Sequence, residues 1–202
     1  AELVASSITD AVEAFNKSDV TLAESVIARD NQIDDAVIQL DEHAITILAR
    51  QSPVAKDLRI VVSALRISSS LERMGDMAEH LAQLARYRFP EKVVPKTIRP
   101  TFKELGALDI GMANMLVDLL RNGDTDLAQK IRDEDDKVDA LHLSVFETVL
   151  SDTWSQETET TVDATLASRY MERFADHAVS IAKKMVYLAT GEWNPQTGAI
   201  QL

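Results

Sequence analysis

The stretch LERMGDMAEHLA, residues 71–82, has a near copy one hundred residues later, MERFADHAVSIA, residues 171–182. Both copies spell Glu-Arg-x-x-Asp, and both place apolar or small residues at spacings of three and four. That spacing is typical of a helix with one buried face. A long repeat of this kind predicts that the chain consists of two copies of one helical unit.

A second acidic pair repeats ahead of each copy. It recurs after 105 residues, whereas the pair inside the quoted stretch recurs after 100, and we place the five-residue difference in a connecting turn, where length changes are tolerated. The four pairs are Asp30 with Asp34, Glu72 with Asp76, Asp135 with Asp139, and Glu172 with Asp176.

Composition favours a packed helical protein. Hydrophobic residues make up 46% of the 202, charged residues make up 27%, and there are only six glycines and five prolines. Cysteine is absent, which rules out disulfides and thiolate metal sites and fits a reducing cytoplasm. We find no membrane-spanning segment or secretory signal, and a net charge of −12 makes nucleic acid an unsuitable partner, so we expect a cytoplasmic protein.

Proline-rich YRFPEKVVPKTIRP, residues 87–100, divides the chain. We therefore predict two domains, residues 1–90 and 91–202, each an antiparallel three-helix bundle, related by pseudo-twofold symmetry to give an all-α fold of six helices. We expect turns at Ser52-Pro53 and Asn122-Gly123, with Pro53 in the first helical position. An apolar seam on the second helix is expected at Val26, Ile33, Val37, Leu40, Ala44 and Ile47. Because the repeat would begin inside the second half's first helix, we expect the first helix to lack its N-terminal turns.

The acidic pairs are candidate metal ligands. Members of each pair are four residues apart and share a helix face, and in a hairpin both pairs of one half lie at the same distance from the turn. Four carboxylates at one level repel one another and would raise their pKa values unless cations intervene, with Arg73 and Arg173 neutralising one each. Oxygen-rich sites favour Mg, Ca, Mn or Fe. The competing interpretation is a plain scaffold with solvated acidic faces.

Other chemistry is not indicated. There is no phosphate-binding glycine loop, His-Glu-x-x-His or nucleophile elbow, and the Glu-x-x-His spacing of ferritin-like oxidases is missing. His142 and His177 do not recur in the other half. Arg59, Arg66 and Arg73 share a face of the third helix; we interpret them as a solubilising face with salt bridges, the alternative being a docking stripe for an acidic partner.

These motifs resemble those of the PhoU family. LERMGDMAEHLA and RYMERFADHAVSIAKKMVYLATGE look like its paired acidic motifs, and PVAKDLRIVVSALRISSSLERMGD looks like the start of its third helix. ARDNQID and DEDDKVD look like the acidic motifs of its second helix. The second copy departs from the pattern: Phe174-Ala175 stand where an aliphatic residue and glycine are usual, and its helix three enters through SQETETTVDA. We therefore expect the two sites to differ.

The resemblance implies a non-enzymatic regulator of phosphate uptake and of the phosphate-starvation response. It would act negatively by coupling the phosphate ABC transporter ATPase to a sensor histidine kinase, meeting the membrane only through the transporter. It also implies iron or zinc clusters at the eight acidic residues above. Two alternatives stay open: a carboxylate-bridged storage or oxidase bundle, and the plain scaffold. The residues leave the choice between monomer and homodimer undecided.

Overall fold

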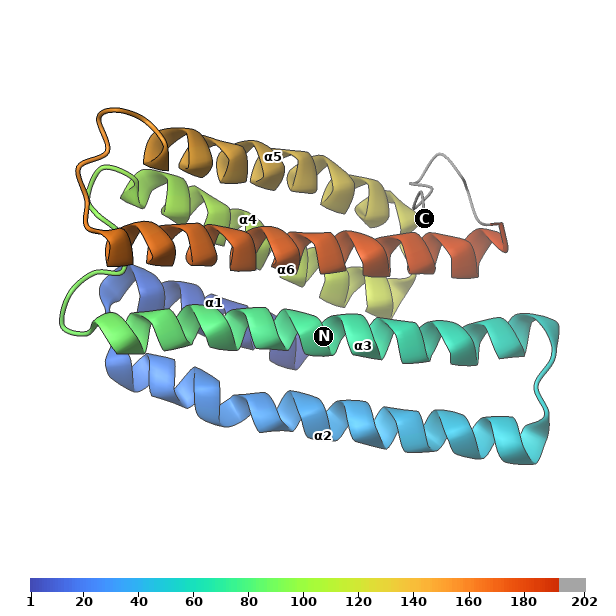
Figure 1. Cartoon of the computed structure of the whole chain (residues 1–202). Helices are drawn as coiled ribbons and strands as arrows, with labels where there is room; N and C mark the ends of the chain where they lie inside the picture. The colour runs from blue at the N-terminus through green and yellow to red at the C-terminus, as the bar shows by residue number, and fades with distance from the viewer. Residues whose placement is uncertain (193–202) are drawn as a thin grey trace.

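The computed structural model describes residues 1–192, which form six α-helices and contain no β-strand (Figure 1). The helices are α1 (Glu2–Lys17), α2 (Val20–Gln51), α3 (Ala55–Arg88), α4 (Arg99–Asn122), α5 (Thr125–Val149) and α6 (Thr158–Thr190). The all-α prediction with three helices on each side of the proline-rich segment is confirmed.

Local sequence explains where several helices begin and end. Asp19 caps α2 by accepting a hydrogen bond from the Leu22 amide at 3.0 Å, which satisfies an amide that has no partner within the helix. Gly123 and Gly191 end α4 and α6 in the left-handed conformation, with φ of 70° and 75°.

The turn between α2 and α3 lies where the sequence predicts it, but the start of α3 differs. Ser52 is left-handed at φ 44° and Val54 is extended at φ −126°, so α3 starts at Ala55. Pro53 therefore belongs to the turn, and the expectation that it occupies the first helical position is wrong.

Each half packs as a three-helix unit, and equivalent helices join the halves. α1, α2 and α3 contact one another, as do α4, α5 and α6. Between the halves α3 packs against α6 and α1 against α4, so each joining pair consists of the same helix from both repeats, as pseudo-twofold symmetry requires. α3 and α6 therefore run side by side through the middle of the molecule, with α2 and α5 outside them (Figure 1).

One hydrophobic core runs through both halves. The rings of Phe15 on α1 and Phe102 on α4 meet with centroids 5.5 Å apart. Nearby, a Cβ added to Gly106 would lie 2.5 Å from Val12 Cγ1, so the absence of a side chain there lets α1 and α4 approach closely.

The segment between α3 and α4 is fixed against α1. Ser18 Oγ donates to the Glu91 carbonyl at 2.9 Å, and Lys92 Nζ donates to the Asn16 carbonyl at 2.8 Å. Val93 and Val94 are buried in the core. The proline-rich segment thus packs as part of the structure that joins the two halves.

The α2–α3 hairpin extends past the adjacent ends of α4 and α5 (Figure 1). Its tip, which comprises the end of α2, the turn at residues 52–54 and the start of α3, is therefore covered less than the rest. Ile45 is 62% exposed and Val54 is 74% exposed. The predicted seam of α2 is buried at Val26, Ile33 and Ala44, but Leu40 is exposed. The seam prediction fails at Leu40 because α2 packs against α1 and α3, and α1, with 16 residues against the 32 of α2, covers only the first part of α2.

Candidate functional site: two acidic clusters

The first acidic cluster lies between α2 and α3, at some distance from the turn that joins these two helices. Asp30 and Asp34 come from α2, and Glu72 and Asp76 come from α3; all four are half-buried. Burial raises the pKa of Asp30 to about 6, and repulsion from Glu79, Asp34, Asp76 and Glu72 adds to the rise. The two predicted pairs of this half therefore lie close enough to interact.

Gly75 brings α2 close to this cluster. A Cβ added there would lie 2.9 Å from Ile33 Cδ1 and 3.0 Å from Asp30 Oδ1. The carboxylate of Asp30 thus lies directly against the backbone of α3, between Met74 and Asp76 in sequence. The second copy has Ala175 at the equivalent position, so the two clusters differ in how their helices meet.

The second cluster lies between α5 and α6. Burial raises the pKa of Asp135 to about 7, followed by repulsion from Asp139, Asp176 and Asp136, while Lys183 opposes the rise. Burial and then the charge of Asp176 also raise the pKa of Asp139 and of Glu172. The four predicted residues of this half are therefore electrostatically coupled as well.

An arginine neutralises one carboxylate of each cluster. Arg73 donates to Asp76 Oδ2 at 2.8 Å, as the sequence suggests. In the second cluster Arg169 pairs with Glu172, whose side chain is only 12% exposed. From the sequence we expect Arg173 to neutralise a carboxylate of this cluster. Arg169 lies one turn earlier on α6 and three residues from Glu172, which is a favourable spacing for a helical ion pair.

Two acidic residues of this region are not among the predicted ligands. Glu79 exerts the strongest charge repulsion on Asp30, and it lies on the face of α3 that carries Glu72 and Asp76. Its equivalent one hundred residues later is Val179, so the search for repeated acids passes over it.

Asp109 is the second missed residue. It is completely buried in α4, both its carboxylate oxygens lack a hydrogen-bond partner within residues 1–192, and burial followed by repulsion from Asp135 raises its pKa well above the usual range. A carboxylate in the apolar seam between Leu105 and Met112 is a signal that the sequence does contain.

The two histidines near the second cluster have local explanations. His142 Nδ1 lies 2.6 Å from Ser168 Oγ, and burial lowers the His142 pKa, with Arg169 adding to the effect. Burial and then Arg173 lower the pKa of His177. Both rings are thus disfavoured as cations, and His142 is satisfied by a hydroxyl group.

The donor chemistry of both clusters suits a hard cation, because each offers carboxylate oxygens in a half-buried setting. In the side-chain positions described for residues 1–192, however, no group of three His, Asp or Glu side chains is arranged to hold a metal ion. Asp76 and Glu172 point their oxygens at arginines instead. Metal coordination would therefore require these two side chains to leave their ion pairs.

Comparison with known proteins identifies the fold and the repeat together. The PhoU domain family matches residues 1–85 and again residues 102–185, so the two halves each correspond to one copy of that domain. The chain belongs to the PhoU family. None of the six helices within residues 1–192 combines the length and apolar character needed to cross a membrane.

Relatives and solved structures of PhoU proteins agree with this assignment. The phosphate-specific transport system accessory protein PhoU homolog 2 of Mycobacterium bovis is 38% identical over 90% of this chain and 85% of its own length. The PhoU homolog of Rhizobium meliloti is 31% identical over 91% of this chain and 78% of its length. The crystal structure of PhoU from Pseudomonas aeruginosa superposes with a TM-score of 0.89 at 30% identity, covering 95% of this chain and 92% of that one.

Proposed function

We propose that this protein is a regulatory accessory protein of phosphate transport. The match of both repeats to the PhoU domain carries the proposal, because relatives that share nearly the whole chain bear the name phosphate-specific transport system accessory protein. In the finer form of the proposal, the protein represses the phosphate-starvation response by linking the phosphate ABC transporter ATPase to a sensor histidine kinase. It acts in the cytoplasm, without catalysis of its own.

The surface of the molecule is suited to protein contacts at the α2–α3 tip. Ile45 and Val54 are each more than half exposed there, as is Ile38 two helical turns before Ile45 on α2, although all three are large apolar side chains. Exposed apolar residues that gather on one projecting element are typical of interaction surfaces. An adaptor needs at least one such surface, and exposed apolar residues at this tip support the proposal that it is one.

A pull-down tests the adaptor role. The tagged protein is incubated with the transporter ATPase and with the cytoplasmic part of the sensor kinase, at high and at low phosphate. We expect both to be retained, and a variant with Ile45→Asp at the tip to lose one of them, whereas the matched surface change Asn114→Asp on α4 retains both. Failure of the wild-type protein to retain either partner at every phosphate level would contradict the proposal.

We further propose that the acidic clusters bind metal ions. Asp30, Asp34, Glu72 and Asp76 would hold one site, with Glu79 beside them, and Asp135, Asp139, Glu172 and Asp176 would hold the other. The support is the convergence of carboxylates in each hairpin: burial raises the pKa values of Asp30 and Asp135, and repulsion from the neighbouring carboxylates adds to the rise. A bound cation would offset this repulsion. Iron and zinc are the first choices, and Mg, Mn and Ca are the further candidates that oxygen ligands allow.

Elemental analysis of protein purified without chelator and without a metal-affinity resin tests the metal proposal. We expect metal in stoichiometric amounts, part of which is lost in the double variant Glu72→Gln with Asp76→Asn. The paired change Glu104→Gln with Asp118→Asn, on exposed positions of α4, should leave the metal content unchanged. Equal metal in both double variants would remove the first cluster as a site.

The same clusters favour a second candidate function, a metal-storage or oxidase bundle. Iron-loaded protein would then turn over oxygen or hydrogen peroxide, or take up iron well beyond two clusters. An inert loaded protein with bound metal limited to the clusters would remove this alternative and leave the regulatory one.

A further inference from the structure

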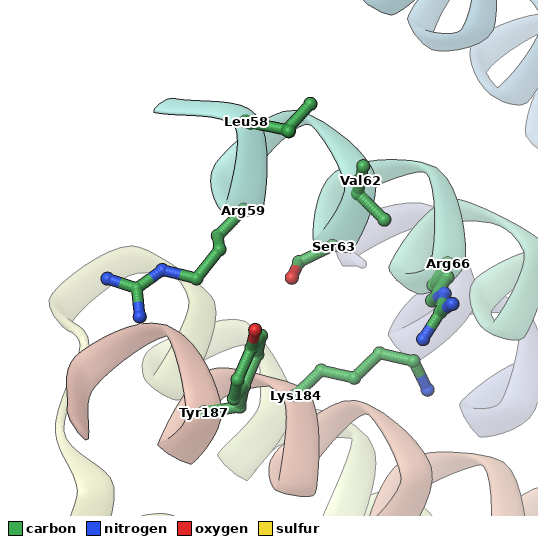
Figure 2. Close-up of a pocket in the computed structure, with 7 residues that line it drawn as sticks. All are labelled: Leu58, Arg59, Val62, Ser63, Arg66, Lys184 and Tyr187. Carbon is green, nitrogen blue, oxygen red and sulfur yellow. The ribbon is translucent and has the colours of Figure 1, made fainter. Parts of the chain in front are cut away.

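A basic pocket lies between the first part of α3 and the last part of α6. Its volume is about 440 Å³, within the range that small-molecule sites occupy. Three cations line it: Arg59 and Arg66 from α3, and Lys184 from α6 (Figure 2). In the described part of the chain no Asp or Glu lines it, although the whole protein carries a net charge of −12.

The cationic groups are divided between the two ends of the pocket. Figure 2 shows the head groups of Arg66 and Lys184 turned toward the same end, with Arg59 at the opposite end. Lys184 Nζ donates to Ser180, to its hydroxyl at 2.7 Å and its carbonyl at 3.2 Å. Neither Arg66 nor Lys184 makes an ion pair within residues 1–192, and burial, then Arg66 and Lys183, lowers the pKa of Lys184. Two cations thus meet at one end, and no carboxylate of the described residues lines the pocket to balance them.

This arrangement separates the three arginines that share a face of α3. Arg73 pairs with Asp76, as expected for a solubilising face with salt bridges. Arg59 donates to the Gly191 carbonyl at 3.2 Å and lies over the Tyr187 ring at 5.8 Å, so it closes one end of the pocket. Arg66 opens into the pocket instead. Within residues 1–192, the salt-bridged interpretation therefore holds for Arg73 and fails for Arg59 and Arg66.

The walls between the two ends are mixed in character. Leu58 and Val62 supply an exposed apolar side, and the hydroxyl groups of Ser63 and Tyr187 face each other across the middle (Figure 2). Arg59 and Arg66 are two helical turns apart, which places them about 10 Å apart along the helix axis. A single small anion would use one end only, whereas a longer ligand would also reach the apolar wall.

We propose that this pocket binds a phosphorylated small molecule that also carries an apolar or aromatic portion, as nucleotides do. The phosphoryl oxygens would lie between Arg66 and Lys184, since guanidinium and ammonium groups together match a doubly charged phosphate. The apolar portion would lie against Leu58 and Val62. The proposal depends neither on metal in the acidic clusters nor on the regulatory role.

Isothermal titration calorimetry of the full chain in EDTA tests it, with ATP, AMP, pyrophosphate and inorganic phosphate as probes. EDTA removes any binding that metal in the acidic clusters would mediate. We expect ATP to bind at one site and more tightly than pyrophosphate. Arg66→Gln and Lys184→Gln should each weaken ATP binding about tenfold or more, and the matched change Lys130→Gln, at an exposed position of α5, should leave it unchanged.

Two further variants separate the parts of the site. Lys184→Arg keeps the charge and should restore most of the affinity, which a mere folding defect in Lys184→Gln would not explain. Leu58→Ala should weaken ATP without changing pyrophosphate. The proposal is overturned if no probe binds the wild-type protein at millimolar concentration, or if Arg66→Gln and Lys184→Gln bind ATP as the wild-type protein does. Equal affinity for ATP and pyrophosphate would overturn its apolar part.

Discussion

Neutralising Asp135 should stabilise the metal-free protein at alkaline pH. In the folded protein its pKa is raised from 3.8 to about 7, so the folded state holds this proton more tightly than the unfolded state does. The favourable contribution of the protonated form is complete below about pH 4 and is lost as the pH rises through about 7. At pH 8 the folded wild-type protein therefore bears the full cost of an ionised, partly buried carboxylate.

The size of this cost follows from the shift. A rise from 3.8 to about 7 corresponds to about 4 kcal/mol as an upper limit. Asp135 is only half-buried, and solvent screening lowers the figure to about 1–2 kcal/mol. We therefore expect Asp135→Asn to raise the free energy of unfolding by about 1–2 kcal/mol at pH 8 and to change it little at pH 4.

Urea denaturation in EDTA at the two pH values measures this difference. Asp118→Asn, on an exposed position of α4, removes the same formal charge and serves as the control, with little expected effect at either pH. A destabilised Asp135→Asn protein at pH 8, or an equal effect of the two substitutions, would refute the reasoning that burial and the neighbouring carboxylates disfavour the ionised form of Asp135.

Three other substitutions test the packing of the first cluster and the contacts between the two halves. Gly75→Ala should displace the Asp30 side chain and weaken metal binding, which metal titration measures. It should change the free energy of unfolding by less than about 1 kcal/mol in urea denaturation, because the better helix propensity of alanine offsets its close contacts with the side-chain ends of Ile33 and Asp30. Ala175→Gly is the converse change in the second cluster. Arg88→Gln should cost about 3 kcal/mol in urea denaturation, since it leaves buried Asp163 without its ion pair, and adding Asp163→Asn should recover part of the loss. Phe102→Ala should cost about 3–5 kcal/mol by the same measurement, and a loss below about 1 kcal/mol would contradict the view of one core shared by both halves.

The fold was predictable because its signals are local and are present twice. The spacing of apolar residues defines each helix, and Gly123 and Gly191 mark two helix ends in the sequence itself. The turn at Ser52 also fixes which residues of α2 and α3 face each other, so the coupling of Asp30 with Glu72 and Asp76 follows from counting.

Other features depend on packing between segments far apart in sequence. Leu40 fits the α2 seam but is exposed, because whether a seam is covered depends on how far the neighbouring helix α1 extends along α2. Arg169 takes the role expected of Arg173, a choice between neighbouring turns that side-chain geometry decides. The basic pocket needs Lys184 beside Arg66, and their separation of 118 positions in the sequence hides that pairing from any local pattern.

The regulatory role can be tested most directly in the cell that makes this protein. The account predicts that deleting its gene switches on the phosphate-starvation genes while phosphate is plentiful, and that restoring the wild-type gene represses them again. Measured transcript levels that stay repressed in the deletion strain at high phosphate, and that rise normally on starvation, would contradict the account.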